Sequence, residues 1–139
     1  MKVFIVLVSL LCSLLAIDAK DAAFVLGFNE EYKTALAQAK EENKLMMLVI
    51  IQDPCPYCER LIDNTLSDPQ VTKLLEDDFV SVIVNQHSQL PLAFKSSAIP
   101  MTFFIDPKNE EGIWESMGYI SVEQFLDDLN EAKLIHSKE

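Results

Sequence analysis

The sequence predicts an α/β fold, in which one domain is built on a mixed β-sheet of about four to five strands with helices on both faces. Segments of strand length alternate with segments whose apolar residues recur every three to four positions, as they do on one face of a helix. Segments 45–52 and 79–85 are apolar almost throughout, which is typical of strands covered on both faces. This order of elements describes a single layered domain.

Four helices are predicted from apolar periodicity and from the residues that begin helices. The first covers residues 29–43, with Asn29 as its capping residue. The second covers residues 55–66. Ser67 and Ser121 each stand three positions before a glutamine, a spacing that favours a helix start at both serines. The helix after Ser121 would bury its apolar face and end the domain.

The remaining strands are predicted to form an antiparallel hairpin near the end of the chain. Segments 101–105 and 113–117 have strand character, and residues 107–112 between them contain turn-forming residues. Before the hairpin, residues 86–98 are expected to form a loop that contains a short helix around Leu92. The sequence has no internal repeat and no low-complexity linker, so residues 20–139 are assigned to one domain.

The N-terminal segment is typical of a secretory signal peptide. A positive charge at Lys2 precedes an apolar run over residues 3–16, and small residues follow. The run is shorter than the roughly 18 residues expected of a membrane span. We therefore predict that residues 1–19 are cleaved, that Cys12 leaves with them, and that the domain is exported. An uncleaved N-terminal anchor is the alternative.

Composition and charge exclude two broad classes of protein. Half of the chain is hydrophobic, which argues against a disordered protein. The formal net charge of −11 provides no basic stripe for phosphates, so nucleic acid is not an expected partner. The acidity promotes solubility, or it could steer the protein toward a basic partner.

The two cysteines that would remain after cleavage, Cys55 and Cys58, are too close in sequence to serve mainly as a structural brace. A disulfide between them closes a ring of only four residues, and so short a ring would stabilise the fold by only about 2 kcal/mol. An exported domain that relied on disulfides for stability would carry more cysteines. The pair is therefore interpreted as a reactive site.

The predicted chemistry follows from the position of Cys55 at the start of a helix. Unpaired backbone N–H groups point at that position and favour the thiolate, which is the nucleophilic form. Lowering a thiol pKa by about 1.5 units requires roughly 2 kcal/mol, which a helix terminus and local hydrogen bonds can supply. Cys58 lies one turn further and would act as the less exposed resolving thiol. Pro56 suits the first turn because it lacks an N–H group.

Several segments resemble the thioredoxin superfamily over nearly all of the predicted domain. Cys55-Pro56-Tyr57-Cys58 is a tetrapeptide that glutaredoxins commonly carry. The surrounding residues, 35–46 and 65–71 together with the 55–58 motif, are closer to exported bacterial thioredoxin-like proteins, and particularly to the C-terminal periplasmic domain of transmembrane thiol-disulfide transducers. Residues 98–102, Ala-Ile-Pro-Met-Thr, are similar to the cis-proline loop of this superfamily.

The resemblance implies a thioredoxin-like fold and a set of substrate-binding residues. In such proteins the proline that corresponds to Pro100 faces the cysteine pair, and the backbone of the preceding residue, here Ile99, pairs with the substrate chain. Pro56 and Tyr57 would complete the substrate contact. The sequence departs from thioredoxin in two places: Asp53-Pro54 replaces the usual tryptophan before the first cysteine, and Val49 stands where cytosolic thioredoxins bury a carboxylate.

Taken together, the sequence predicts a periplasmic thiol-disulfide oxidoreductase that reduces or isomerises protein disulfides. Catalysis would use Cys55 as nucleophile and Cys58 as resolving residue, with no cofactor beyond their disulfide and no bound metal. A membrane protein would supply electrons, and the protein would be a monomer. Two alternatives remain: a metal-binding or metallochaperone module that uses the two thiolates, and a non-catalytic binding domain.

Overall fold

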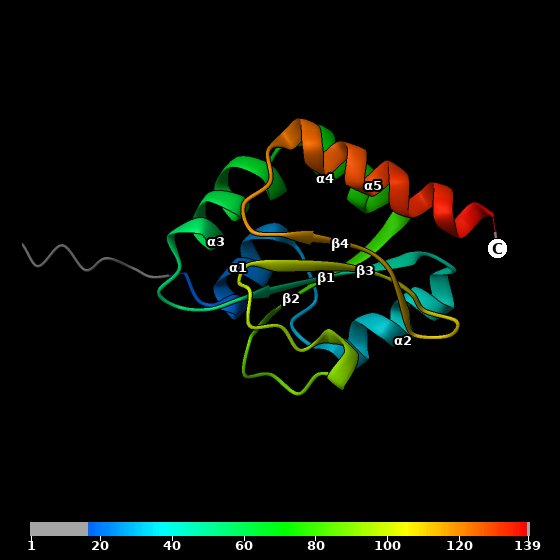
Figure 1. Cartoon of the computed structure of the whole chain (residues 1–139), viewed down its shortest axis with the longest axis horizontal. Helices are drawn as coiled ribbons and strands as arrows, with labels where there is room; N and C mark the ends of the chain where they lie inside the picture. The colour runs from blue at the N-terminus through cyan, green and yellow to red at the C-terminus, as the bar shows by residue number, and fades with distance from the viewer. Residues whose placement is uncertain (1–16, 139) are drawn as a thin grey trace, which may run out of the picture.

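A computed structural model describes residues 17–138, so most of the predicted signal peptide lies outside the described residues. Four strands form one mixed sheet in the order β2-β1-β3-β4 (Figure 1). The strands are β1 (Leu45–Ile51), β2 (Phe79–Asn85), β3 (Met101–Asp106) and β4 (Glu111–Met117). β1 runs parallel to β2 and antiparallel to β3, and β3 pairs with β4 in the predicted antiparallel hairpin. The predicted mixed sheet is confirmed.

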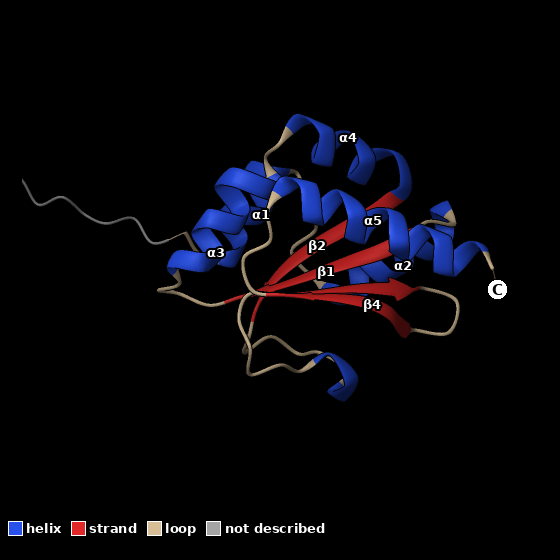
Figure 2. Cartoon of the chain, turned by 45° about the horizontal axis from the view of Figure 1, so that its top comes forward, coloured by secondary structure: helices blue, strands red, loops and turns tan. Residues whose placement is uncertain are grey.

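Helices cover both faces of the sheet, as predicted (Figure 2). The helices are α1 (Ala19–Leu26), α2 (Tyr32–Glu42), α3 (Pro56–Arg60), α4 (Pro69–Asp78) and α5 (Val122–Ser137), and two short segments are a π-helix, η1 (Leu61–Leu66), and a 3-10 helix, η2 (Leu92–Phe94). α1, α3, η1, α4 and α5 pack on one face, and α2 and η2 pack on the other. None of the helices within residues 17–138 combines the length and apolar character needed to cross a membrane.

The apolar segment that predicts a central strand becomes β1, which is buried along its whole length. Its side chains alternate between two core clusters, with Met47 and Val49 facing the α5 side and Met46 and Leu48 facing the α2 side. All four are inaccessible to solvent. This two-sided burial explains why the segment lacks the alternation of apolar and polar residues seen in half-exposed strands.

Helix α1 was not predicted, because the residues that it buries fully are small. Asp18 caps it by accepting a hydrogen bond of 2.9 Å from the backbone N of Asp21. Its fully buried residues are the small Ala22 and Ala23. The larger Phe24, in contrast, is 85% exposed. Periodicity in large apolar residues therefore could not reveal this helix.

Two of the predicted helix starts are wrong, because the expected capping residues make other hydrogen bonds. Asn29 does not cap α2; its Nδ2 donates to the Gln38 side chain and to the Ser81 backbone oxygen, and Asn29 bridges to β2. α4 begins after Asp68, whose carboxylate caps the helix, whereas the Ser67 hydroxyl donates 2.7 Å to the Ile62 carbonyl.

The other predicted boundaries need smaller corrections. Ser121 does cap α5, as predicted, by accepting from the backbone N of Gln124. β4 begins at Glu111, two residues earlier than expected, since the turn between β3 and β4 is shorter than the sequence indicates. The short helix expected around Leu92 is η2.

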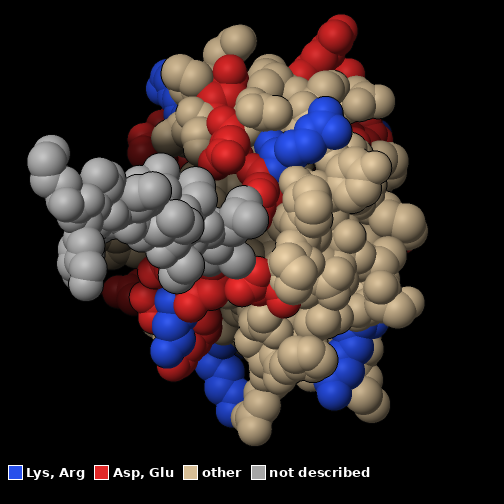
Figure 3. All heavy atoms as spheres, turned by 90° about the vertical axis from the view of Figure 1, so that its left-hand side faces the viewer, with Lys and Arg blue, Asp and Glu red and all other residues tan. Residues whose placement is uncertain are grey.

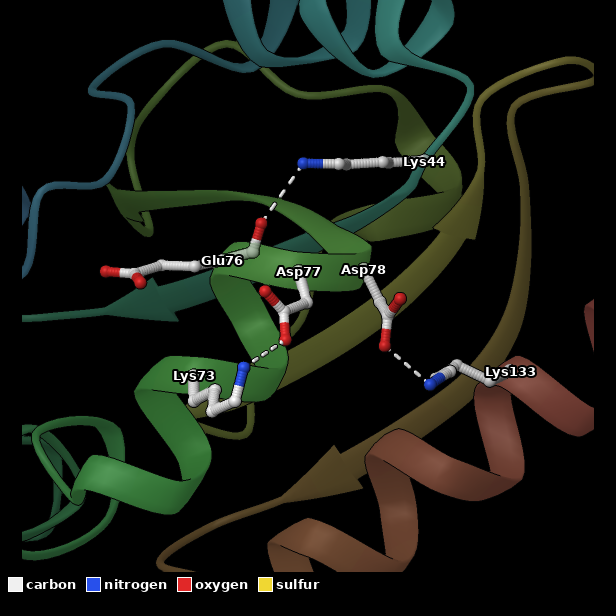
Figure 4. Close-up of polar contacts among 6 residues, drawn as sticks. All are labelled: Lys44, Lys73, Glu76, Asp77, Asp78 and Lys133. Atoms are coloured by element: carbon white, nitrogen blue, oxygen red, sulfur yellow. Dashed lines mark hydrogen bonds and ion pairs between the residues drawn. The ribbon is translucent and has the colours of Figure 1, made fainter.

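One ion pair joins α4 to α5, and a second lies within α4 (Figure 4). Lys133 of α5 pairs with Asp78 of α4, and Lys73 pairs with Asp77 at 2.8 Å within α4. The hydrogen bond between Lys73 and Asp77 raises the pKa of the lysine and lowers the pKa of the aspartate. Solvent screens such exposed pairs, so they contribute little to stability. The apolar clusters therefore dominate the stability of the fold.

Tyr32 is a buried residue whose hydroxyl has no hydrogen-bond partner among the described residues. Burial, with a smaller effect of the Glu110 charge, raises the pKa of Tyr32 to about 12. In the unfolded chain the pKa is about 10. The native state therefore holds the phenol proton more tightly than the unfolded chain does. This contribution to the free energy of unfolding is fully present below about pH 10 and is lost as the pH rises toward 12.

Replacing Tyr32 with phenylalanine should remove this pH dependence. We expect Tyr32→Phe to be at least as stable as the wild type at pH 8, because it deletes an unpaired buried hydroxyl. Between about pH 10 and 12 the wild type should lose stability relative to the variant. Urea denaturation of both proteins across this range measures the difference, and identical pH profiles would contradict the account.

Candidate active site

Cys55 occupies the capping position of α3, where the chain turns from β1 into the helix. Its Sγ accepts a hydrogen bond of 3.2 Å from the backbone N of Cys58. Pro56 takes the first helical position, as predicted, where its missing N–H group leaves no bond unmade. A backbone N–H group that points at the sulfur stabilises negative charge on it.

The two cysteines form a disulfide, with their Cα atoms 5.2 Å apart. Both are largely buried: Cys55 is 6% exposed and Cys58 is 2% exposed. Cys58 is thus the less exposed of the two, as predicted, and the order of attack stays a prediction. Tyr57, between them, is 60% exposed and is available to a partner.

The helix predicted over residues 55–66 changes geometry after its first five residues. α3 ends at Arg60, and the chain continues as the π-helix η1. Thr65 of η1 is fully buried, and its hydroxyl donates 2.6 Å to the backbone oxygen of Ile120. π-helical turns are uncommon and occur frequently at functional sites. In this protein the π-helical turn places the Thr65 hydroxyl against the loop between β4 and α5.

The loop before β3 ends at Pro100, beside the end of β1 from which the chain enters α3, since Met101 pairs with Ile50. The Ile99–Pro100 peptide bond is cis, as the resemblance implied. Ile99 packs against the core cluster that contains both cysteines. The carbonyl oxygen of Pro100 accepts 2.8 Å from the backbone N of Gly118, which has a positive φ of 77°. The structure therefore gathers the predicted site residues at one end of the molecule.

The polar surroundings of the cysteines differ from those of thioredoxins with a buried acid. Val49 is fully buried in the same cluster as Cys55 and Cys58, so this position offers no proton acceptor. Among residues 17–138 the buried carboxyl group belongs to Asp106, which lies at the opposite end of β3. No buried carboxyl group among residues 17–138 therefore lies at the end of the sheet that carries Cys58.

Sequence reasoning missed three features of this site. The Asp53–Pro54 bond is also cis, and no sequence pattern indicated this. The Arg60 guanidinium lies over the Tyr119 ring, a contact that no sequence pattern indicated. The Thr65 bond to the loop after β4 had no sequence signal, because the two segments are 55 residues apart.

Metal binding receives no support from side-chain clustering in the described part of the chain. Residues 17–138 contain no group of three or more His, Cys, Asp or Glu side chains arranged to hold a metal ion. Structural zinc sites normally use four ligands, and the Cys55–Cys58 pair alone offers two.

Comparison with protein families identifies the fold. The sequence pattern of a family described as thioredoxin-like matches residues 28–107, which is more than half of the chain. The chain belongs to this thioredoxin-like family. The match spans the segment from the end of α1 to the end of β3, and therefore includes both cysteines and Pro100. The predicted membership of the thioredoxin superfamily is confirmed.

Solved structures support the same fold. A thioredoxin from Thermus thermophilus is 28% identical, with a TM-score of 0.68 over 76% of this chain and 86% of that chain. The C-terminal domain of DsbD from Neisseria meningitidis, in its reduced form, is 19% identical, with a TM-score of 0.60 over 84% of this chain and 99% of that domain. At that identity the second likeness concerns the fold alone.

Curated relatives include the anterior gradient proteins of frogs. Anterior gradient protein 1 of Xenopus tropicalis is 30% identical over 88 residues, which are 58% of this chain and 47% of the relative. Anterior gradient protein 2 of Xenopus laevis is 29% identical over 79 residues, 56% of this chain and 43% of the relative. The chain thus spans less than half the length of these relatives.

Proposed function

We propose that this protein is a periplasmic thiol-disulfide oxidoreductase that reduces or isomerises protein disulfides. The observation that carries the proposal is the geometry of Cys55: its sulfur caps α3 and accepts the N–H of Cys58, the residue with which it forms a disulfide. Thiolate stabilisation and a resolving thiol within bonding distance are the two requirements for dithiol exchange.

The reaction begins with the reduced protein. The Cys55 thiolate attacks one sulfur of a substrate disulfide, and the substrate S–S bond breaks as a mixed disulfide forms. The displaced substrate sulfur leaves as a thiolate and takes up a proton. The Cys58 thiolate then attacks the Cys55 sulfur, which releases the second substrate thiol and leaves the Cys55–Cys58 disulfide. Two electrons pass to the substrate, and an external dithiol must restore the reduced protein.

Polypeptide substrates fit the surface around the cysteines. Figure 3 views this end of the molecule, where acidic side chains gather beside a broad region without charged side chains. Pro54, Pro56 and Tyr57 are exposed next to Cys55. As the resemblance to the superfamily implies, the backbone at Ile99 would pair with the substrate chain and Pro100 would face the disulfide. These residues would bind the chain on either side of the reacting sulfur.

Export and the electron source are part of the proposal. The apolar segment 3–16 supports cleavage of a signal peptide and a periplasmic location. A membrane protein with an exposed dithiol would return the Cys55–Cys58 disulfide to its reduced form. The family includes both reductants and oxidants, with potentials from about −270 to about −120 mV. The Ile99-Pro100 pair resembles reductive members, which favours reduction.

Insulin reduction tests the activity. With dithiothreitol as electron donor, the wild-type protein should accelerate the precipitation of reduced insulin chains. A variant with both Cys55→Ser and Cys58→Ser should leave the rate at the background of dithiothreitol alone. Equal rates for the wild type and this variant would refute the proposal and favour a non-catalytic binding domain.

A further inference from the structure

The end of α3 contacts the loop after β4 through an interaction that the exchange reaction itself does not use. Arg60 is the last residue of α3, and its guanidinium carbon lies 4.5 Å from the centre of the Tyr119 ring. This is within the roughly 6 Å over which an aromatic face attracts a cation. Tyr119 is partly buried and packs against the core cluster that contains Cys55 and Cys58. The contact therefore links the cysteine helix to a loop beside the site.

The same loop is hydrogen-bonded to two other parts of the site. On one side, the backbone N of Gly118 donates 2.8 Å to the carbonyl oxygen of Pro100. On the other side, the carbonyl oxygen of Ile120 accepts 2.6 Å from the buried Thr65 hydroxyl of η1. Residues 118–120 thus connect the cis-proline loop with the helical segment that follows the cysteines.

We propose that Arg60 is a positioning residue for the reaction with polypeptide substrates. This inference rests on the proposed function. A polypeptide substrate must contact Cys55 and the Pro100 loop at once, so its reaction depends on the spacing between α3 and that loop. The Arg60–Tyr119 contact holds α3 itself against residues 118–120. Thr65 holds the chain only further along, in η1, so of these two side-chain contacts with residues 118–120 the one made by Arg60 is nearer to the cysteines.

A positioning role differs measurably from a direct electrostatic effect on the sulfur. If Arg60 acted on the thiolate, its loss would slow the attack on every disulfide and would shift the reduction potential of the Cys55–Cys58 pair. If Arg60 acts through the loop, only substrates that bind the Pro100 loop are affected. A small neutral disulfide such as hydroxyethyl disulfide reacts at Cys55 without needing that loop.

The test compares two substrates across matched variants. We expect Arg60→Gln to lower kcat/KM for insulin reduction about two- to fivefold, the range that an exposed cation–π contact of about 0.5–1 kcal/mol provides. Its rate with hydroxyethyl disulfide and its reduction potential should equal those of the wild type. Tyr119→Leu, which keeps the charge, should show the same split, and the double variant should be no worse than either single variant. Arg60→Lys should recover part of the insulin rate.

Lys73→Gln is the matched control, because it removes one exposed positive charge on α4, where Lys73 pairs with Asp77. It should leave both rates unchanged. The inference is overturned if Arg60→Gln reduces insulin as fast as the wild type. It is also overturned if the rates of Arg60→Gln with insulin and with hydroxyethyl disulfide fall together, or if Lys73→Gln loses as much insulin reduction as Arg60→Gln. Failure of the proposed function is distinguishable, since the wild type would then show no insulin reduction that depends on its cysteines.

Discussion

Replacing Cys58 with serine should convert the protein into a trap for its substrates. The variant keeps the Cys55 thiolate, so the first attack still forms a mixed disulfide. Without the Cys58 thiol, the adduct persists until an external thiol resolves it. An intramolecular thiol has an effective concentration far above that of millimolar external thiols, so we expect turnover to fall on the order of a hundredfold or more. Non-reducing electrophoresis of the variant incubated with oxidised insulin would show a covalent adduct.

The control for this prediction is Cys55→Ser, which retains the buried Cys58. Because Cys58 is only 2% exposed, it should form little or no adduct with a protein disulfide. Thermal unfolding should verify that both variants remain folded. An adduct of similar yield on the Cys55→Ser variant would reverse the assigned order of the two cysteines.

Replacing Phe104 with alanine should cause the largest loss of stability. Phe104 lies on β3 and is fully buried, and its ring centre is 5.9 Å from that of Phe79 and 6.1 Å from that of Phe125. The substitution removes the packing between the sheet and the α5 side and leaves a cavity. Phenylalanine-to-alanine changes in protein cores cost about 3–5 kcal/mol, against a total stability of about 5–15 kcal/mol.

The matched control for Phe104 is Phe24, which is the same residue type at 85% exposure. Phe24→Ala should change the free energy of unfolding by less than about 0.5 kcal/mol. Urea denaturation of all three proteins in the oxidised state supplies the values. A loss below about 1 kcal/mol for Phe104→Ala would show that this cluster does not support the fold as described.

The sequence predicted the sheet and the site because those features depend on local patterns. Segment 79–85 became β2 with the predicted bounds, since β-branched residues and flanking polar residues mark both ends. The Cys55–Cys58 spacing defined a reactive pair, and its position after an apolar strand placed it at a helix start. Pro100 was found through its resemblance to a family loop.

Two of the features that the sequence missed depend on contacts between segments that are far apart in the chain. Asn29 has the side chain of a capping residue, but its hydrogen bonds to Gln38 and Ser81 compete with that role. Helix α1 buries small alanines, whose periodicity is weak. The Arg60–Tyr119 contact joins residues of two separate elements, and nothing in either local sequence encodes it.

The account depends on activation of Cys55 at the start of α3, and the pH dependence of its alkylation tests this directly. The reduced protein is treated with iodoacetamide across a pH series, and modification of Cys55 is followed by mass spectrometry of its peptide. We predict that the rate reaches half of its maximum at least about one pH unit below 8.5, the pKa of an ordinary free cysteine. A midpoint near 8.5 would contradict the account, because Cys55 would then behave as an unactivated thiol.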